Sequence, residues 1–273
     1  MTLEHGLGWI PSQEEHPKDF AHLMAAHLVK AGGDLRSHSV HHKHGPVLNQ
    51  GRTAQCVGFT ARQLLDSEPI IFPGGPSAQQ LYALAQRVDE WPGENYEGTS
   101  IRAAANVLLD MGYLSEYVWA DKVEDAAWWI IEHGPVMAGF MLYEGMLTLQ
   151  EGYMSVSGAR LGGHSVLLTG WDGERNAFRG VNSWGKGWGE QGEFWLSYLD
   201  LYSLMAGMHE VCAPTEKGLE VFVPEPPQPP EPPTPLAPPV TPQPPKPGAR
   251  VVGQGVEEVL AAHDDIALSD ECY

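Results

Sequence analysis

In the first half of the chain, apolar residues recur every three to four positions, the spacing that gathers them on one face of a helix. Loops at residues 69–76 and 90–98 interrupt this pattern. The pattern predicts helices at residues 17–30, 56–65, 77–89, 99–111 and 123–132. We expect the three helices between residues 56 and 111 to form one lobe of the protein.

From residue 134 onward the pattern changes to short β-prone runs separated by Gly-rich turns. Runs of this kind predict strands at residues 135–143, 165–169, 177–181 and 193–198. We expect them to form a small antiparallel sheet or barrel. The predicted fold class is therefore α+β, with a helical lobe and a β lobe.

Composition divides the chain into four parts. The stretch at residues 224–249 is mostly Pro with a few polar residues, which predicts polyproline II that cannot pack a core. It separates a folded domain, residues 34–223, from an acidic tail, residues 250–273, and residues 1–33 form an N-terminal arm. Such a linker is a semi-rigid spacer, and it suits attachment of the domain to a partner in a larger assembly.

Charge and cysteine spacing limit the kinds of partner and the cellular compartment that we expect for this protein. The chain has 273 residues and a formal net charge of −19, and its basic residues do not cluster, which excludes a nucleic-acid or anionic-membrane surface. No apolar run approaches the roughly 18 residues that span a bilayer, and the N-terminus has no signal-peptide pattern. The three cysteines are widely spaced, which favours a reducing compartment. We expect a cytoplasmic or virion-associated protein.

One cysteine lies where a nucleophile is easily activated. Cys56 falls in the first turn of a predicted helix, where unpaired N–H groups favour a thiolate and lower the pKa of the thiol. Gln50 lies six residues upstream across a Gly51 turn, so its amide and the Cys56 backbone N–H can converge on the oxygen of an attacked carbonyl. The alternative is a buried structural cysteine at a helix start.

A histidine and an asparagine in the β half complete a possible catalytic set. His164 is expected at the mouth of a strand, after glycines such as Gly163 that let a substrate backbone approach. Asn182 can accept a hydrogen bond from one imidazole nitrogen and so fix the tautomer, while Trp184 would cover that bond from water. The alternative for the Gly-Lys-Gly-Trp-Gly run is a tight hairpin around buried tryptophans.

Taken in order, these motifs resemble the papain-like cysteine peptidases of family C1. They are Asn49-Gln50-Gly51, Gln55-Cys56, Gly162-Gly163-His164 and Asn182-Ser-Trp-Gly-Lys-Gly-Trp-Gly189. The resemblance implies a papain-like two-lobed fold and is nearest to the compact bacterial and viral type without a propeptide. It implies Cys56 as nucleophile, His164 as general acid and base, Asn182 as its orienter and Gln50 as oxyanion-hole donor, with the thiol pKa lowered by His164.

Three further expectations concern the surroundings of this site. The N-terminal arm carries one short helix, too short to fill a cleft as the family's propeptides do, so it should regulate access weakly at most. Gly74-Gly75 is a candidate for lining the substrate cleft. The four histidines at residues 38, 41, 42 and 44 have no carboxylate or cysteine neighbour in their loop, so we expect them to be solvated rather than to bind a metal.

The sequence thus predicts a cysteine peptidase that hydrolyses peptide bonds of a peptide or protein substrate through an acyl-enzyme, with no cofactor. Two alternatives remain. One is a papain-fold binding or structural protein presented on its Pro-rich stalk. The other is a related acyl transferase or amidase, which the same residues would serve.

Overall fold

The computed structural model describes residues 5–13, 34–91, 93 and 95–218. The predicted helix at residues 17–30, the Pro-rich linker and the acidic tail lie outside the described residues. In the described part, no helix is long and apolar enough to cross a membrane.

Five α-helices are described, and four were predicted within a few residues. They are α2 (Cys56–Leu65), α3 (Ala78–Val88), α4 (Ile101–Asp110), α5 (Val123–Glu132) and α6 (Tyr198–Met205). Hydroxyl caps fix three of the starts: Ser77 forms a capping box with Gln80 at α3, and Ser100 and Ser197 each accept from the third residue of their helix, α4 and α6. Two short 3₁₀ turns, η1 (Leu35–Ser37) and η2 (Glu144–Met146), complete the helical elements.

One eight-stranded sheet runs through the protein. Its strands are β1 (Ser39–His41), β2 (Leu114–Trp119), β3 (Val136–Tyr143), β4 (Tyr153–Met154), β5 (Arg160–Asp172), β6 (Ala177–Val181), β7 (Glu193–Ser197) and β8 (His209–Glu216). The order is β2-β8-β3-β5-β6-β7-β4, with β1 paired to β5. All pairs are antiparallel except β4 with β7. The predicted α+β class is confirmed.

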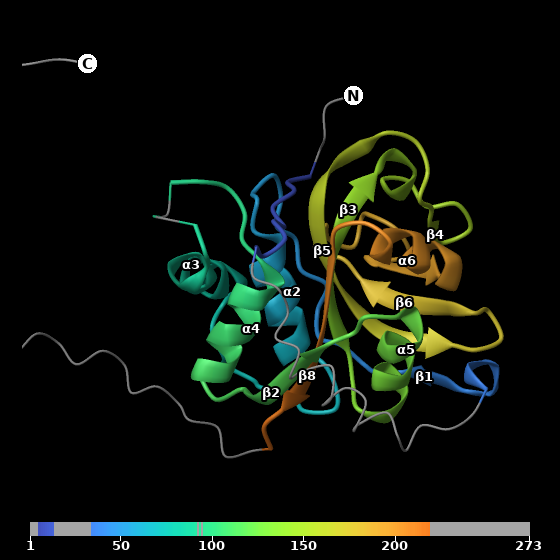
Figure 1. Ribbon diagram of the computed structural model, residues 1–273, viewed down its shortest axis with the longest axis horizontal. Helices are drawn as coiled ribbons and strands as arrows, with labels where there is room; N and C mark the ends of the chain where they lie inside the picture. The colour runs from blue at the N-terminus through green and yellow to red at the C-terminus, as the bar shows by residue number, and fades with distance from the viewer. Residues whose placement is uncertain (1–4, 14–33, 92, 94, 219–273) are drawn as a thin grey trace, which may run out of the picture. The chain divides into compact units, whose positions relative to one another are not determined.

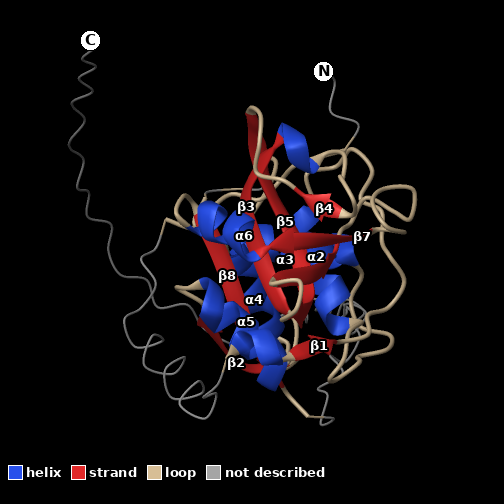
Figure 2. Ribbon diagram, turned by 90° about the vertical axis from the view of Figure 1, so that its right-hand side faces the viewer, coloured by secondary structure: helices blue, strands red, loops and turns tan. Residues whose placement is uncertain are grey.

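The helices cover the sheet in two groups. Figure 1 shows α2, α3 and α4 together on one side of the strands, with α5 and α6 on the other, and Figure 2 shows β3, β5 and β8 running side by side between them. Each group has its own buried cluster. One contains Leu64, Leu108 and Met137, and the other contains Trp129, Phe140 and Phe178. Burial of these large apolar side chains supplies most of the stability, at roughly 25 cal/mol per Å² of apolar surface.

The β half differs from its prediction in two ways. Strand β5 has thirteen residues rather than five, so His164 lies inside the strand and not at its mouth. The reason is that Gly162 and Gly163 keep extended backbone and pair with Leu142 and Met141 of β3. Strand β8 was missed because Pro214, which argues against a strand, lies near its end.

Candidate active site

Cys56 is the first residue of α2, as the sequence predicted, but its thiol is wholly buried. Burial raises the pKa of this thiol to about 12, and the smaller influence of the nearby backbone of Ser165, Gly8 and Val57, which lowers the pKa, does not offset it. The expectation of a lowered pKa is therefore wrong for this conformation. Desolvation outweighs the helix start, because no water reaches the sulfur to stabilise a thiolate.

His164 and Asn182 form the central polar contact of the site. His164 Nε2 lies 2.9 Å from Asn182 Oδ1, and both side chains are fully buried. Since Asn182 Oδ1 also accepts from the Ser183 backbone N–H at 2.7 Å, it is the acceptor, and Nε2 carries the imidazole proton. Nδ1 therefore holds a lone pair, and among the described residues it has no hydrogen-bond partner. Burial lowers the pKa of His164 to about 4, against the raising effect of Asn182.

Cys56 and His164 belong to one place in the fold. The backbone of Ser165, the neighbour of His164 on β5, is close enough to the Cys56 thiol to lower its pKa. One turn along α2, Thr60 Oγ1 accepts from Ser165 Oγ at 2.9 Å, which fixes the helix against the strand. Within the described residues, however, the sulfur and His164 Nδ1 are not hydrogen-bonded. With these pKa values, the Cys56 thiol is protonated and the His164 imidazole is neutral at pH 7. The structure therefore shows the uncharged form of this pair, before any proton transfer.

Trp184 lies over the imidazole, in the position that covers the bond to Asn182. Its ring stacks on His164 with the centroids 4.6 Å apart, and only 2% of its surface is exposed. Trp188 packs edge-on against Trp184 at 5.1 Å. On the N-terminal side, the His5 ring stacks on Trp184 at 4.7 Å. The Gly-Trp-Gly run is thus both a turn around buried tryptophans and a cover for the histidine.

The side-chain amide of Gln50 is fixed at both of its ends by hydrogen bonds. Its Oε1 accepts from Ser183 Oγ at 2.6 Å, which fixes the orientation of the amide. Its Nε2 donates to Thr53 O at 2.7 Å and to Gly6 O at 3.1 Å. The group that the sequence assigns to an oxyanion therefore already donates to two carbonyl oxygens, and one of them, Gly6 O, belongs to the chain's own N-terminal segment.

That segment, residues 5–12, crosses the site and is called the strap below. Its Gly8 and Trp9 backbone N–H groups donate to Gly163 O at 3.1 and 3.2 Å on the β lobe. On the helical lobe, Gly8 O accepts from the Thr99 N–H at 2.9 Å, and Ile10 N donates to Thr99 O at 3.0 Å. The predicted arm helix at residues 17–30 lies outside the described residues, so these contacts across the site are made by the eight residues of the strap, which precede it in the chain.

Two residues that touch the strap were not found from the sequence. Thr99 pairs with Trp9 as a short parallel bridge, whereas Gly75 of the predicted glycine pair lies against the Arg62 and Tyr113 side chains. Gly74-Gly75 is therefore not the segment that runs beside the strap. Glu210 on β8 is 2% exposed and accepts from the Trp9 indole N–H at 2.8 Å. A lone Glu in a β-prone run gives no signal of such a role.

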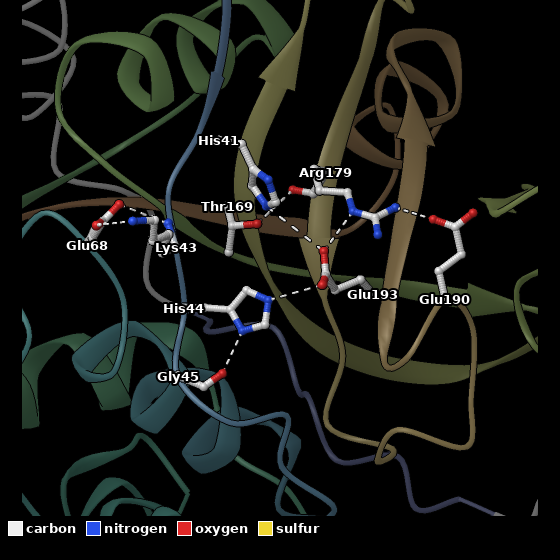
Figure 3. A network of polar contacts seen from close by, with 9 residues as sticks. All are labelled: His41, Lys43, His44, Gly45, Glu68, Thr169, Arg179, Glu190 and Glu193. Atoms are coloured by element: carbon white, nitrogen blue, oxygen red, sulfur yellow. Dashed lines mark hydrogen bonds and ion pairs between the residues drawn. The ribbon is translucent and has the colours of Figure 1, made fainter.

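Of the histidines at residues 38–44, His41 is exposed as expected, whereas His42 and His44 are partly buried and make specific contacts. His42 Nε2 lies 2.7 Å from Ile130 O, and His44 Nε2 lies 3.5 Å from Glu193 Oε1. Figure 3 shows Glu193 between His44, His41 and Arg179, whose Nε donates to Glu193 Oε2 at 2.8 Å. The carboxylate partner that the loop lacks in sequence comes from β7, 149 residues after His44. This contact ties the segment that leads to Gln50 onto the sheet.

We expect the His44–Glu193 contact to make stability depend on pH. The hydrogen bond to Glu193 raises the pKa of His44 above its ordinary 6.5, so this stabilisation is complete below pH 6.5 and is lost as pH rises through the raised value. The same bond lowers the pKa of Glu193 from 4.5 to about 2. The stabilisation contributed by the ionised Glu193 is therefore complete above pH 4.5 and is lost as the pH falls toward 2. His44→Gln should therefore reduce the free energy of unfolding most between these limits.

Urea unfolding of His44→Gln and the parent at about pH 5.5 and about pH 9 measures this difference. The loss should be larger at the lower pH. An equal loss at both values would show that the protonated form of His44 contributes nothing. His38→Gln is the control, since the His38 side chain contacts nearby groups of η1 and the Trp128 ring and not Glu193.

Comparisons with known proteins agree with the fold. The solved structure of xylellain, a cysteine protease from Xylella fastidiosa, superposes with a TM-score of 0.56 at 17% identity, over 78% of this chain and 97% of that one. Procathepsin B S9 from Trypanosoma congolense superposes with a TM-score of 0.50 at 14% identity, over 78% and 87% of the two chains. The protein therefore has the papain-like fold.

Sequence comparison points to the same group. Residues 92–208 match the family model described as papain family cysteine protease. Cathepsin B-like cysteine proteinase 4 of Caenorhabditis elegans is 30% identical over 118 residues, 38% of this chain and 35% of the relative. A cathepsin B-like cysteine proteinase of Schistosoma japonicum is 40% identical over 68 residues, 24% and 20% of the two chains. The resemblance to papain-like cysteine peptidases is thereby confirmed.

The extent of these matches is limited. The matched segment spans about a third or less of the length of these curated relatives. The segment that matches the family model contains His164 and Asn182, whereas Gln50 and Cys56 precede it. The roles of the latter two residues therefore rest on their own geometry.

Proposed function

We propose that this protein is a cysteine peptidase that hydrolyses peptide bonds with Cys56 as nucleophile. The observation that carries the proposal is the buried hydrogen bond from His164 Nε2 to Asn182 Oδ1. It places the imidazole proton on Nε2 and leaves Nδ1 able to accept the thiol proton. Gln50 Nε2, already bound to a carbonyl oxygen, supplies a donor for the oxyanion.

The reaction follows from these groups. His164 Nδ1 takes the Cys56 thiol proton, and the thiolate forms a bond to the carbonyl carbon of the substrate. The negative charge that develops on the carbonyl oxygen is bound by Gln50 Nε2 and the Cys56 backbone N–H. His164 then gives its proton to the leaving amine as the C–N bond breaks, which leaves a thioester. Water, deprotonated by His164, hydrolyses the thioester and restores the thiol.

Asn182 and Trp184 position the base in this scheme. Asn182 Oδ1 holds the imidazole through Nε2, and the Ser183 N–H holds Asn182 Oδ1 in turn. Trp184 stacks on the ring and excludes water from the bond, which strengthens it in a medium of lower dielectric. Neither side chain exchanges a proton with the substrate.

The two alternatives would give different results in a cleavage assay. A papain-fold binding protein on a Pro-rich stalk would cleave nothing, while an acyl transferase would pass the acyl group to an added amine. No residue contact in the described part favours either over hydrolysis. The resting state of the thiol does not favour a binding protein, because the hydrogen bond from His164 Nε2 to Asn182 Oδ1 still supports a general base at Nδ1.

A diverse peptide pool tests the proposal, with products identified by mass in the presence and absence of an added primary amine. The assay includes the full-length parent, Cys56→Ala and Trp9→Ala, whose strap lacks its buried indole. We expect hydrolysis products that depend on Cys56 and are unchanged by the amine. No cleavage in any form would contradict the proposal, and amide products formed with the amine would show a transferase.

A further inference from the structure

We propose that one buried face of helix α2, formed by Cys56, Thr60 and Gln63, positions the base and its orienter against the nucleophile. Thr60 holds the strand that carries His164, and Gln63 holds the segment that carries Asn182. These three residues are called the α2 stripe below, and Thr60 and Gln63 are its positioning residues. This inference rests on the peptidase function proposed above.

The spacing of the α2 stripe follows from helix geometry. Residues three and four positions apart lie on the same face of a helix, so Thr60 and Gln63 follow Cys56 along one line. All ten residues of α2 are buried, and Figure 1 shows the helix beside strand β5. Cys56 is the first residue of α2, so a contact along the stripe fixes where the nucleophile lies relative to the strand.

Thr60 fixes the helix against the strand of the base. Its Oγ1 accepts from Ser165 Oγ at 2.9 Å, and both side chains are fully buried. Successive side chains of a strand point to opposite faces, so Ser165 contacts α2 while His164 beside it binds Asn182. The hydroxyl pair lies one helical turn from Cys56 and one strand residue from His164, so it sets the separation of these two groups.

Gln63 fixes the same helix against the orienter. Its side chain is 3% exposed, and its Nε2 donates to the Asn182 backbone carbonyl at 3.2 Å. The bond from Gln63 and the bond to His164 therefore meet on one residue. Arg62, another buried polar residue of α2, bonds instead to Asp66 and to carbonyls of the loop that follows the helix. The two neighbours on α2 thus serve different lobes.

Stability does not explain a glutamine at position 63. Within the described residues, Gln63 Oε1 is buried and has no hydrogen-bond partner. A buried acceptor without a donor is unfavourable, and an apolar side chain of the same length would avoid it. A hydrogen bond, in contrast to apolar packing, fixes both a distance and a direction. An amide kept here at a cost in stability is therefore expected of a residue that serves the geometry of the site.

The first test replaces Gln63 by Met in the full-length chain, because Met has a similar length but no N–H donor. We expect a urea midpoint close to that of the parent, since removal of the unpaired oxygen offsets the lost bond. We also expect kcat to fall by about ten- to a hundredfold with little change in KM, the effect of misplacing a catalytic group. Gln86→Met is the matched control, since Gln86 is a buried glutamine of α3 that donates to Tyr96 O and Gly98 O.

The second test removes the hydroxyl pair. Ser165→Ala and Thr60→Val should each lower kcat by about tenfold, and the double variant should be no slower than either, because both remove the same bond. Thr60→Ser keeps the acceptor and should retain most of the parent kcat. Thr169→Val is the control, since Thr169 is a buried hydroxyl on the same strand, five residues beyond His164, and donates to Arg179 O.

The labelling of Cys56 by iodoacetamide as a function of pH is a readout that needs no turnover. A misplaced imidazole stabilises the thiolate less and raises the pKa of the thiol. In Gln63→Met and Ser165→Ala the labelling rate should therefore rise about one pH unit higher than in the parent and the two controls. Labelling displaced in this way without peptide cleavage in any form would support the α2 stripe and contradict the peptidase.

Two results would overturn the inference. One is parent kcat and parent labelling in folded Gln63→Met and Ser165→Ala. The other is a loss of turnover that only follows the loss of folded protein, which would show a purely structural role. Ser165→Ala removes a single oxygen atom, so it decides the question if Gln63→Met does not fold.

Discussion

Cys56→Ala and His164→Ala are each expected to lower kcat/KM by about 10⁴-fold or more, and the double variant should be no worse than the poorer single one. The reason is that nucleophile and base act as a unit. Without His164 nothing accepts the thiol proton, and without Cys56 the proton transfer serves no attack. Additive losses in the double variant would mean that the two residues work independently.

The control for this comparison is Cys212→Ala. Cys212 is also a free, fully buried cysteine, and burial raises its pKa well above the ordinary value. It lies on β8, and the proposed reaction gives it no part. Its replacement should cost some stability but leave turnover per folded molecule unchanged. Turnover lost in Cys212→Ala and kept in Cys56→Ala would move the nucleophile to β8.

Gln50→Ala is expected to lower kcat by about 10²–10³-fold, the usual effect of removing one oxyanion-hole donor, with little change in KM. Gln50→Glu should behave alike, because it keeps the size and the oxygen that accepts from Ser183 but lacks the N–H groups. Steady-state kinetics on one cleaved peptide measures both. Gln80→Ala is the control, since Gln80 only caps α3.

The same replacement should affect the strap in the opposite direction. Gln50 Nε2 also binds Gly6 O, so its loss loosens the strap and should speed the labelling of Cys56. A variant with a more accessible thiol and a slower chemical step would separate the two roles of Gln50. If Gln50→Ala kept the parent kcat, the donor for the oxyanion would have to be sought elsewhere.

The fold could be predicted from the sequence where local pattern decides it. Helix α5 begins and ends where its apolar periodicity does, and α3 and α4 begin just after their capping serines. Strand β6 likewise has its predicted bounds. These elements are specified by neighbouring residues, so a single sequence is enough to place them.

The site could be predicted only in part, because some of its properties depend on distant residues. Motif order predicted the residues Cys56, His164 and Asn182, but the pKa of Cys56 depends on what buries it. The strap has neither helical nor strand periodicity, and its partners Thr99, Gly163 and Glu210 lie about 90 to 200 residues away in the chain. Nothing local in Gly6–Trp9 shows that two glycines and a tryptophan fit those partners.

Covalent trapping shows whether Cys56 is the nucleophile of a peptidase. The full-length Trp9→Ala variant is incubated with a limiting amount of an electrophilic peptide epoxide, and the modified residue is located by peptide mapping while turnover is followed. We expect a single adduct on Cys56, formed in step with the loss of turnover and absent in the Trp9→Ala variant that also carries His164→Ala. An adduct on Cys212 or Cys272 that accompanies the loss of turnover, or full turnover with Cys56 modified, would contradict it.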